Sequence, residues 1–212
     1  GEGRAFCAGL DTANFGRMAS GQRGGERLLQ GERTAGGANP PQHTVMVWRE
    51  QPVPVIAAVH GVAFGGGFQL ALAADMRFVA PDARMSVMEI KWGLVPDMAG
   101  MVLLRGLVRD DLVRELTYTG RIFEGAEAER LGLATRVCAD PRAEALALAA
   151  EIAGRSPTAI RAAKRLLNMM QDEDQHALLK AESAEQAALI GSPNQVEAIM
   201  SNLQKRSAAY AD

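Results

Sequence analysis

The sequence contains little cysteine, and its two cysteines, Cys7 and Cys138, lie far apart without a Cys-x-x-Cys partner. This pattern argues against a disulfide-bonded scaffold and against a zinc site. It fits a reducing compartment, and we expect the cytoplasm. No apolar run reaches the length of a membrane span. The formal net charge of −2 creates no basic field, so neither nucleic acid nor a membrane surface is expected as a partner.

Several catalytic motifs are also missing. A phosphate-binding loop of the form GxxxxGK[ST], a zinc-protease HExxH and a nucleophile-elbow GxSxG do not occur. The three histidines, His43, His60 and His176, have no metal-ligand spacing. The sequence therefore lends little support to hydrolysis by a nucleophilic triad, and we expect no metal site.

What is present is an ordinary globular composition, with 48% hydrophobic and 23% charged residues in a chain of 212. Such a chain is long enough to bury a core without disulfides or metals. Residues 21–42 are rich in Gly and Arg and are predicted to form a loop. Strand-like and helix-like segments alternate over residues 53–137, which favours an α/β architecture, whereas residues 141–212 show almost only helical patterns.

A glycine turn stands out within the alternating region. The run 53–59 is rich in β-branched residues and predicts a buried strand, and Gly65, Gly66 and Gly67 precede a helical pattern that begins at Phe68. Glycine permits close contact between backbone and ligand, and the first N–H groups of a helix are unpaired, so this turn could bind an oxyanion. A tight turn that needs glycine for packing alone explains the same residues equally well.

The glycine turn is the middle one of three characteristic segments. The first is Ala-Phe-Cys-Ala-Gly-Leu-Asp at residues 5–11, and the third is Met-Glu-Ile-Lys-Trp-Gly-Leu-Val-Pro-Asp at residues 88–97. In this order and spacing they resemble the crotonase superfamily, the enoyl-CoA hydratase/isomerase family. The resemblance covers nearly the whole chain.

The resemblance implies an α/β crotonase (ClpP/crotonase-like) fold, a spiral of ββα units followed by a helical C-terminal region. Residues 1–140 would form the spiral core. Residues 141–212 would form the helical region that usually mediates trimer formation, so a homotrimer or hexamer is expected. Against the family pattern, the strands that precede the first motif are missing before Gly1. We therefore expect either a truncated chain or a sequence from which an N-terminal segment is omitted. A real truncation would leave an edge of the sheet bare and weaken the affinity for coenzyme A.

The resemblance also implies an oxyanion hole for the thioester carbonyl of an acyl-CoA, made by the backbone N–H groups of Leu10 and Gly66. Preorganised donors at this place would stabilise an enolate. The positions expected to contact coenzyme A are Ala8, Asp11, Gly65 and Lys205. For Lys205, a solvated lysine on a helix is an equal alternative.

Hydratases of this family use two glutamates, and the matching positions here are Gln69 and Glu89. Glu89 is retained, but an amide cannot exchange a proton at neutral pH, so Gln69 can only orient water or bind substrate. Asp97 follows a Gly-Leu-Val-Pro turn and resembles the acid/base carboxylate of the dienoyl-CoA isomerase branch. Without the resemblance, Glu89 would be interpreted as an exposed strand carboxylate and Asp97 as a helix N-cap.

The function implied by the resemblance is hydration or double-bond isomerisation of an enoyl-CoA in fatty-acid or related acyl metabolism. The catalytic residues would be Glu89, Asp97 and Gln69, and the pair of Gln69 and Asp97 favours isomerisation. No metal or redox cofactor is expected, because coenzyme A is part of the substrate. The alternative is a catalytically weakened crotonase homologue that only binds acyl-CoA.

Overall fold

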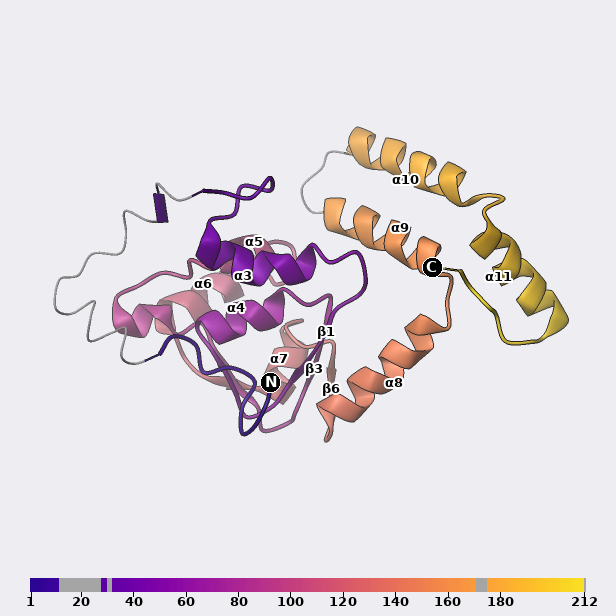
Figure 1. Cartoon of the computed structure of the whole chain (residues 1–212). Helices are drawn as coiled ribbons and strands as arrows, with labels where there is room; N and C mark the ends of the chain where they lie inside the picture. The colour runs from indigo at the N-terminus through magenta and orange to yellow at the C-terminus, as the bar shows by residue number, and fades with distance from the viewer. Residues whose placement is uncertain (12–27, 30–31, 171–174, 212) are drawn as a thin grey trace. The chain divides into compact units, whose positions relative to one another are not determined.

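A computed structural model of the chain describes residues 1–11, 28–29, 32–170 and 175–211 (Figure 1). Part of the predicted loop 21–42 therefore lies outside the described residues. The chain divides into two compact units. Unit 1 comprises residues 1–50 and 55–145, and unit 2 comprises residues 51–54 and 146–212.

Unit 1 contains every strand found among the described residues, together with several short helices. The strands are β1 (Ile56–Val59), β2 (Val62–Phe64), β3 (Met76–Val79), β4 (Arg84–Ser86), β5 (Phe123–Glu124) and β6 (Arg136–Val137). The helices are α3 (Pro40–Arg49), α4 (Gly66–Leu72), the 3-10 helix η1 (Glu89–Trp92), α5 (Gly100–Leu104), α6 (Asp110–Thr119) and α7 (Gly125–Arg130).

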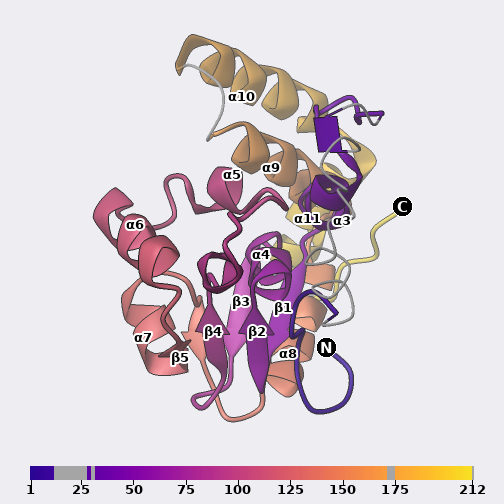
Figure 2. The same ribbon diagram turned by 90° about the vertical axis from the view of Figure 1, so that its left-hand side faces the viewer.

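The strands form two three-stranded sheets. β1, β3 and β6 are parallel in one sheet, and β2 and β4 are parallel in the other, with β5 antiparallel to β4. The chain places one strand in each sheet and then forms a helix, first as β1–β2–α4 and then as β3–β4–η1. This alternation is a spiral of ββα units, and Figure 2 shows its two sheets as adjacent layers.

The core of unit 1 joins the sheets to α4. Its buried side chains include Val59, Val79, Phe68 and Phe123, and the two phenylalanine rings meet edge to face with centroids 5.7 Å apart. β1 consists only of apolar residues, as expected for a parallel strand that is covered on both faces. Most residues of α4 are buried, so a polar side chain on this helix must find its partners inside the protein.

Unit 2 is helical. Its helices are α9 (Pro157–Met169), α10 (Gln175–Leu189) and α11 (Pro193–Gln204), and α8 (Pro141–Ala153) contributes its residues from 146 onwards. Proline opens α9 and α11, a position where its missing N–H costs the helix nothing. A two-pronged ion pair links α9 to α10, because Arg165 Nε and Nη2 each donate to a Glu185 carboxylate oxygen over 2.6 Å. Among the described residues, no helix combines the length and apolarity needed to cross a membrane.

Candidate active site

The glycine turn joins β2 to α4, and two of its glycines are required by the backbone. Gly65 has φ 52° and ψ −119°, a conformation that an L-residue with a Cβ strongly disfavours. A Cβ on Gly67 would overlap the carbonyl oxygen of Cys7. The first turn of α4 therefore packs directly against the backbone of the segment around Cys7.

The N-terminal segment runs alongside β2 as a short parallel partner. Cys7 pairs with Ala63, its N–H donates to the Val62 carbonyl over 3.1 Å, and its carbonyl accepts from Phe64 N–H over 3.1 Å. If this parallel register is continued by three residues, Leu10 lies opposite Gly66. The approach is close, since a Cβ on Gly9 would lie 3.7 Å from Gly66 N.

The backbone N–H groups of Leu10 and Gly66 belong to two segments that pack against each other at Gly9. In the described parts of the chain, neither of them donates a backbone hydrogen bond. Gly66 is the first residue of α4, where the helix has no internal acceptor for the N–H and its dipole favours negative charge. An N–H group that is unpaired at a helix start can donate to an oxygen on which charge develops, although α4 itself is short.

Three of the residues predicted to contact coenzyme A belong to this same backbone region. Ala8 and Asp11 are exposed, and Gly65 is partly exposed. Lys205 is exposed in unit 2, where it caps the C-terminal end of α11 with φ 52°. Contact of all four with coenzyme A stays a prediction.

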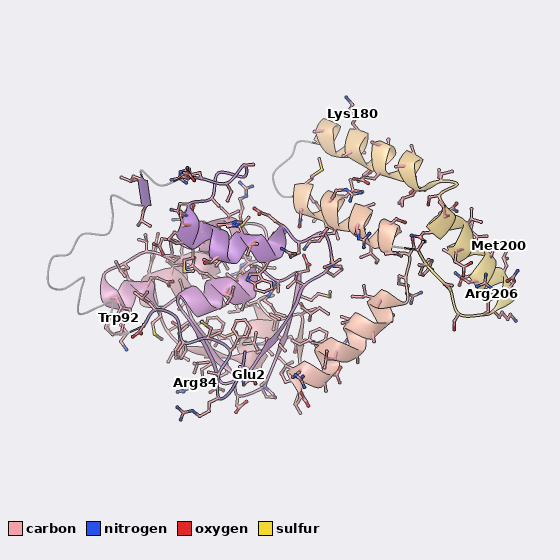
Figure 3. All side chains as sticks on the ribbon, in the orientation of Figure 1. Glu2, Arg84, Trp92, Lys180, Met200 and Arg206 are labelled. Carbon is pink, nitrogen blue, oxygen red and sulfur yellow. The ribbon has the colours of Figure 1, made fainter. Side chains whose placement is uncertain are left out.

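The carboxylate of Glu89 lies beside the glycine turn. Glu89 begins η1 and is only 9% exposed, whereas Trp92 at the other end of η1 is 48% exposed at the surface of unit 1 (Figure 3). A Cβ on Gly65 would lie 3.4 Å from Glu89 Oε1, so the missing side chain leaves room for the carboxylate. The interpretation of Glu89 as an exposed strand carboxylate is therefore wrong: the residue is buried and lies on a 3-10 helix.

Burial raises the pKa of the Glu89 carboxyl above its usual range, because the charged form loses water. Hydrogen bonds to its own backbone N–H and to the Gln69 side chain act in the opposite direction, and the negative charge of Asp97 adds to the rise. Glu89 Oε1 accepts from Gln69 Nε2 over 2.7 Å. Its Oε2 is buried and has no partner among the described residues. An unpartnered oxygen on a carboxylate with a raised pKa is suited to accept a proton.

Gln69 lies on α4 and is only 2% exposed, so its amide must find its partners inside the protein. Its Oε1 accepts from Met98 N–H over 2.9 Å and from Gly100 N–H over 2.8 Å, while its Nε2 donates to Glu89. The carbonyl side of the amide is therefore used by the protein, and any role of Gln69 in orienting water or binding substrate stays a prediction for its second N–H. The Met98 and Gly100 N–H groups could not be identified as its partners from the sequence, since no local pattern connects them to α4.

Asp97 is exposed on the loop between η1 and α5, near enough to Glu89 for its charge to act there. The alternative role as a helix N-cap is wrong, because the N-cap of α5 is Ala99 and no side chain caps that helix. Ala99 itself has φ 70°, an unusual value for a residue with a side chain. No group of three His, Cys, Asp or Glu residues in the described segments could bind a metal ion.

The sequence profile of the enoyl-CoA hydratase/isomerase family matches residues 1–212. The chain belongs to this family. It is 31% identical to human mitochondrial methylglutaconyl-CoA hydratase over 211 residues, which covers 97% of the chain and 59% of the relative. It is 28% identical to the peroxisomal Δ(3,5)-Δ(2,4)-dienoyl-CoA isomerase of Arabidopsis thaliana over 216 residues, which covers 100% of the chain and 77% of the relative. The chain thus spans about three-fifths of the human relative's length.

Solved structures in the family have the same fold. An enoyl-CoA hydratase from Polaromonas sp. JS666 superimposes with a TM-score of 0.87 at 30% identity, over 100% of this chain and 80% of that one. An enoyl-CoA hydratase from Thermobifida fusca YX in complex with CoA superimposes with a TM-score of 0.73 at 32% identity, over 90% of this chain and 74% of that one. The predicted crotonase fold, with its helical C-terminal region, is confirmed.

Proposed function

We propose that this chain carries the active site of an enoyl-CoA isomerase, in which Glu89 exchanges a proton with one carbon atom of an acyl-CoA and Asp97 with another. The observation that supports this most directly is the buried Glu89 carboxylate, with one oxygen bonded to Gln69 and the other without a partner. Family membership supports an acyl-CoA thioester as the substrate. Gln69 stands at the position of the second hydratase glutamate, and its amide cannot transfer a proton.

The proposed reaction begins with a 3-enoyl thioester. Glu89 removes a proton from the α-carbon, and the electron pair moves onto the thioester oxygen to form a dienolate. The N–H groups of Leu10 and Gly66 stabilise the negative oxygen, and loss of one such donor typically costs about 3 kcal/mol of barrier. Return of a proton to the γ-carbon gives the conjugated 2-enoyl thioester, so the atoms and charges balance.

Asp97 is the proposed second acid/base group. Its exposure lets it exchange protons with water, and its charge acts on Glu89. The two carboxyl groups differ in their contact with water, because Asp97 is exposed and Glu89 is buried. Asp97 would supply or receive the proton at one carbon while Glu89 acts at the other.

Hydration is the second candidate, because the relatives include proteins named hydratases. It requires a group that activates water and a group that protonates the α-carbon. Glu89 and Asp97 would have to divide these roles without the second glutamate. The third candidate is an acyl-CoA-binding protein with weakened catalysis.

Two substrates distinguish these candidates. The protein is incubated with a 3-enoyl-CoA and with crotonyl-CoA, the absorbance of the conjugated thioester is followed, and mass spectrometry detects added water. Isomerisation of the first with little hydration of the second is expected. Rapid hydration of crotonyl-CoA would favour the hydratase. Binding of both without turnover, unaffected by Glu89→Gln, would favour the binding protein.

We also propose that copies of the chain associate through unit 2, as a homotrimer or hexamer. Large apolar side chains are exposed there, including Leu203 at 74%, Ile190 at 65% and Met170 at 58%. Such side chains are typical of a surface that another chain covers. Light scattering during size-exclusion chromatography measures the mass in solution, and a monomer would contradict this proposal.

A further inference from the structure

Resting on the proposed function, we propose that Gln69 is a positioning residue that ties loop 97–100 to Glu89 and makes Glu89 Oε2 the atom that carries the proton. Gln69 forms hydrogen bonds with loop 97–100 and with Glu89 at the same time. Its carbonyl oxygen lies 2.9 Å from Met98 N and 2.8 Å from Gly100 N, and its nitrogen lies 2.7 Å from Glu89 Oε1. We call these three hydrogen bonds the Gln69 clamp.

The orientation of the Gln69 amide follows from its partners. Two backbone N–H donors converge on one end of the side chain, and only the carbonyl oxygen can accept from both. The opposite orientation would direct the NH₂ group at two donors and leave a carbonyl oxygen against a carboxylate. The surroundings therefore force Gln69 to donate to Glu89 Oε1, and the proton must bind Oε2 if this bond is to persist.

The loop contributes a strained backbone that the clamp stabilises. Ala99 lies between the two donors and has φ 70°, so the N–H groups on either side of it converge. Converging N–H groups of this kind form a concavity that favours an oxygen with negative charge. The fit is tight, because a Cβ on Gly100 would lie 2.8 Å from Gln69 Oε1. Gln69 therefore holds the short stretch that connects Asp97 to α5.

The clamp also changes the acidity of Glu89. Burial raises the pKa of this carboxyl most, and its own backbone N–H lowers it. The side chains that act on it are Gln69 from α4, whose hydrogen bond lowers the pKa, and Asp97 from the loop, whose charge raises it. Removal of the amide donor should raise the pKa of Glu89 further. The base must be deprotonated to act, so the acid limb of the kcat/KM profile should then move to higher pH.

Two substitutions separate the two ends of the clamp. Gln69→Met keeps the length of the side chain but removes both its acceptor and its donor. Gln69→Glu keeps an acceptor for Met98 and Gly100 but places a carboxylate oxygen against Glu89, where two charges cannot coexist and one proton is shared. Gln42→Met, which removes a glutamine from the cap of α3, is the matched control.

The first measurement does not require turnover. Amide hydrogen exchange by NMR should show Met98 and Gly100 exchanging about tenfold faster in Gln69→Met, and protected in Gln69→Glu and in the control. A carbon-13 titration of the glutamate carboxyl groups, assigned with Glu89→Gln, should show a higher pKa for Glu89 in Gln69→Met and a still higher one in Gln69→Glu.

The second measurement follows the reaction. In Gln69→Met, kcat should fall about 10- to 100-fold with little change in KM, and the acid limb should move to higher pH. Unchanged exchange of the Met98 and Gly100 amides, or an unchanged Glu89 titration, overturns the clamp even if the wild type is active. An inactive wild type with the expected exchange and titration overturns the proposed function instead, and leaves the clamp intact.

Discussion

The two sides of the candidate site are built in different ways. On one side are backbone N–H groups, from Leu10 and from Gly66. On the other side are side chains, the Glu89 carboxylate and the Gln69 amide that binds it. We call these the backbone side and the carboxylate side. The first is set by glycine and by the backbone pairing of the N-terminal segment with β2, whereas the second depends on side-chain contacts between α4, η1 and the loop before α5.

This difference indicates which substitutions each side tolerates. On the backbone side, a side chain at Gly67 is a disturbance, since the space there is filled by the Cys7 carbonyl. On the carboxylate side, shape can be kept while chemistry is removed, because glutamate and glutamine occupy the same volume. Substitutions on the first side should therefore reduce stability, and those on the second should reduce activity.

The largest expected effect is on the carboxylate side. Glu89→Gln should lower kcat by about 10²- to 10⁴-fold, because the buried proton acceptor is lost while the bond from Gln69 can still form. The enzyme assay on a 3-enoyl-CoA measures this loss. Glu124→Gln, an exposed glutamate in β5, is the matched control and should keep its activity. Comparable activity of Glu89→Gln and wild type would show that Glu89 is not the proton carrier.

The second largest expected effect is a loss of stability when a methyl group is added to Gly67 on the backbone side. Gly67→Ala should lower the free energy of unfolding by about 3 kcal/mol, since its Cβ has no room beside the Cys7 backbone. Denaturant unfolding measures the change. Gly36→Ala is the control, because its Cβ has only ordinary contact distances of 3.5 Å and more. Equal stability of the two variants would show that the close packing at Gly67 is not required.

A smaller loss of stability is expected at Gly65. Gly65→Ala should cost about 1–3 kcal/mol, because φ 52° with ψ −119° is strained for alanine. Gly37→Ala has similar strain at φ 82° but open space around its Cβ. Thermal unfolding and kcat/KM should be measured for both. We expect both variants to lose stability and only Gly65→Ala to lose kcat/KM, which would show that Gly65 matters for the site as well as for the fold. Equal kcat/KM in the two variants would show that it does not.

The smallest expected effect is a dependence of stability on pH. The pKa of Glu89 is raised in the folded state, so its contribution to stability is present below the unfolded pKa and is lost as pH rises through the folded pKa. Glu89→Gln should therefore gain stability relative to wild type at about pH 8, and the gain should shrink in mildly acidic solution. Denaturant unfolding at both pH values measures it. A gain that grows on acidification would contradict the raised pKa.

Much of the fold could be predicted from local patterns. The apolar run 53–59 contains β1, the glycine turn opens α4, and proline opens α9 and α11. These features depend on short-range preferences of the backbone. The pairing of the strands into two sheets depends on contacts between distant residues, and for it the resemblance to a family was needed.

The amino-acid sequence by itself determined the local backbone of the glycine turn. Glycines at positions 65 and 67 are enough to specify a turn and a helix start, because backbone sterics act locally, whereas the segment at residues 5–11 reaches this turn only through its tertiary pairing with β2. Only the tertiary structure decided the carboxylate side. Burial of Glu89, the convergence of two N–H groups around Ala99, and the direction of the Gln69 amide arise where α4, η1 and the loop before α5 pack together. Buried polar groups must form hydrogen bonds with the groups that the fold places beside them, and these partners cannot be predicted from the residues adjacent in sequence.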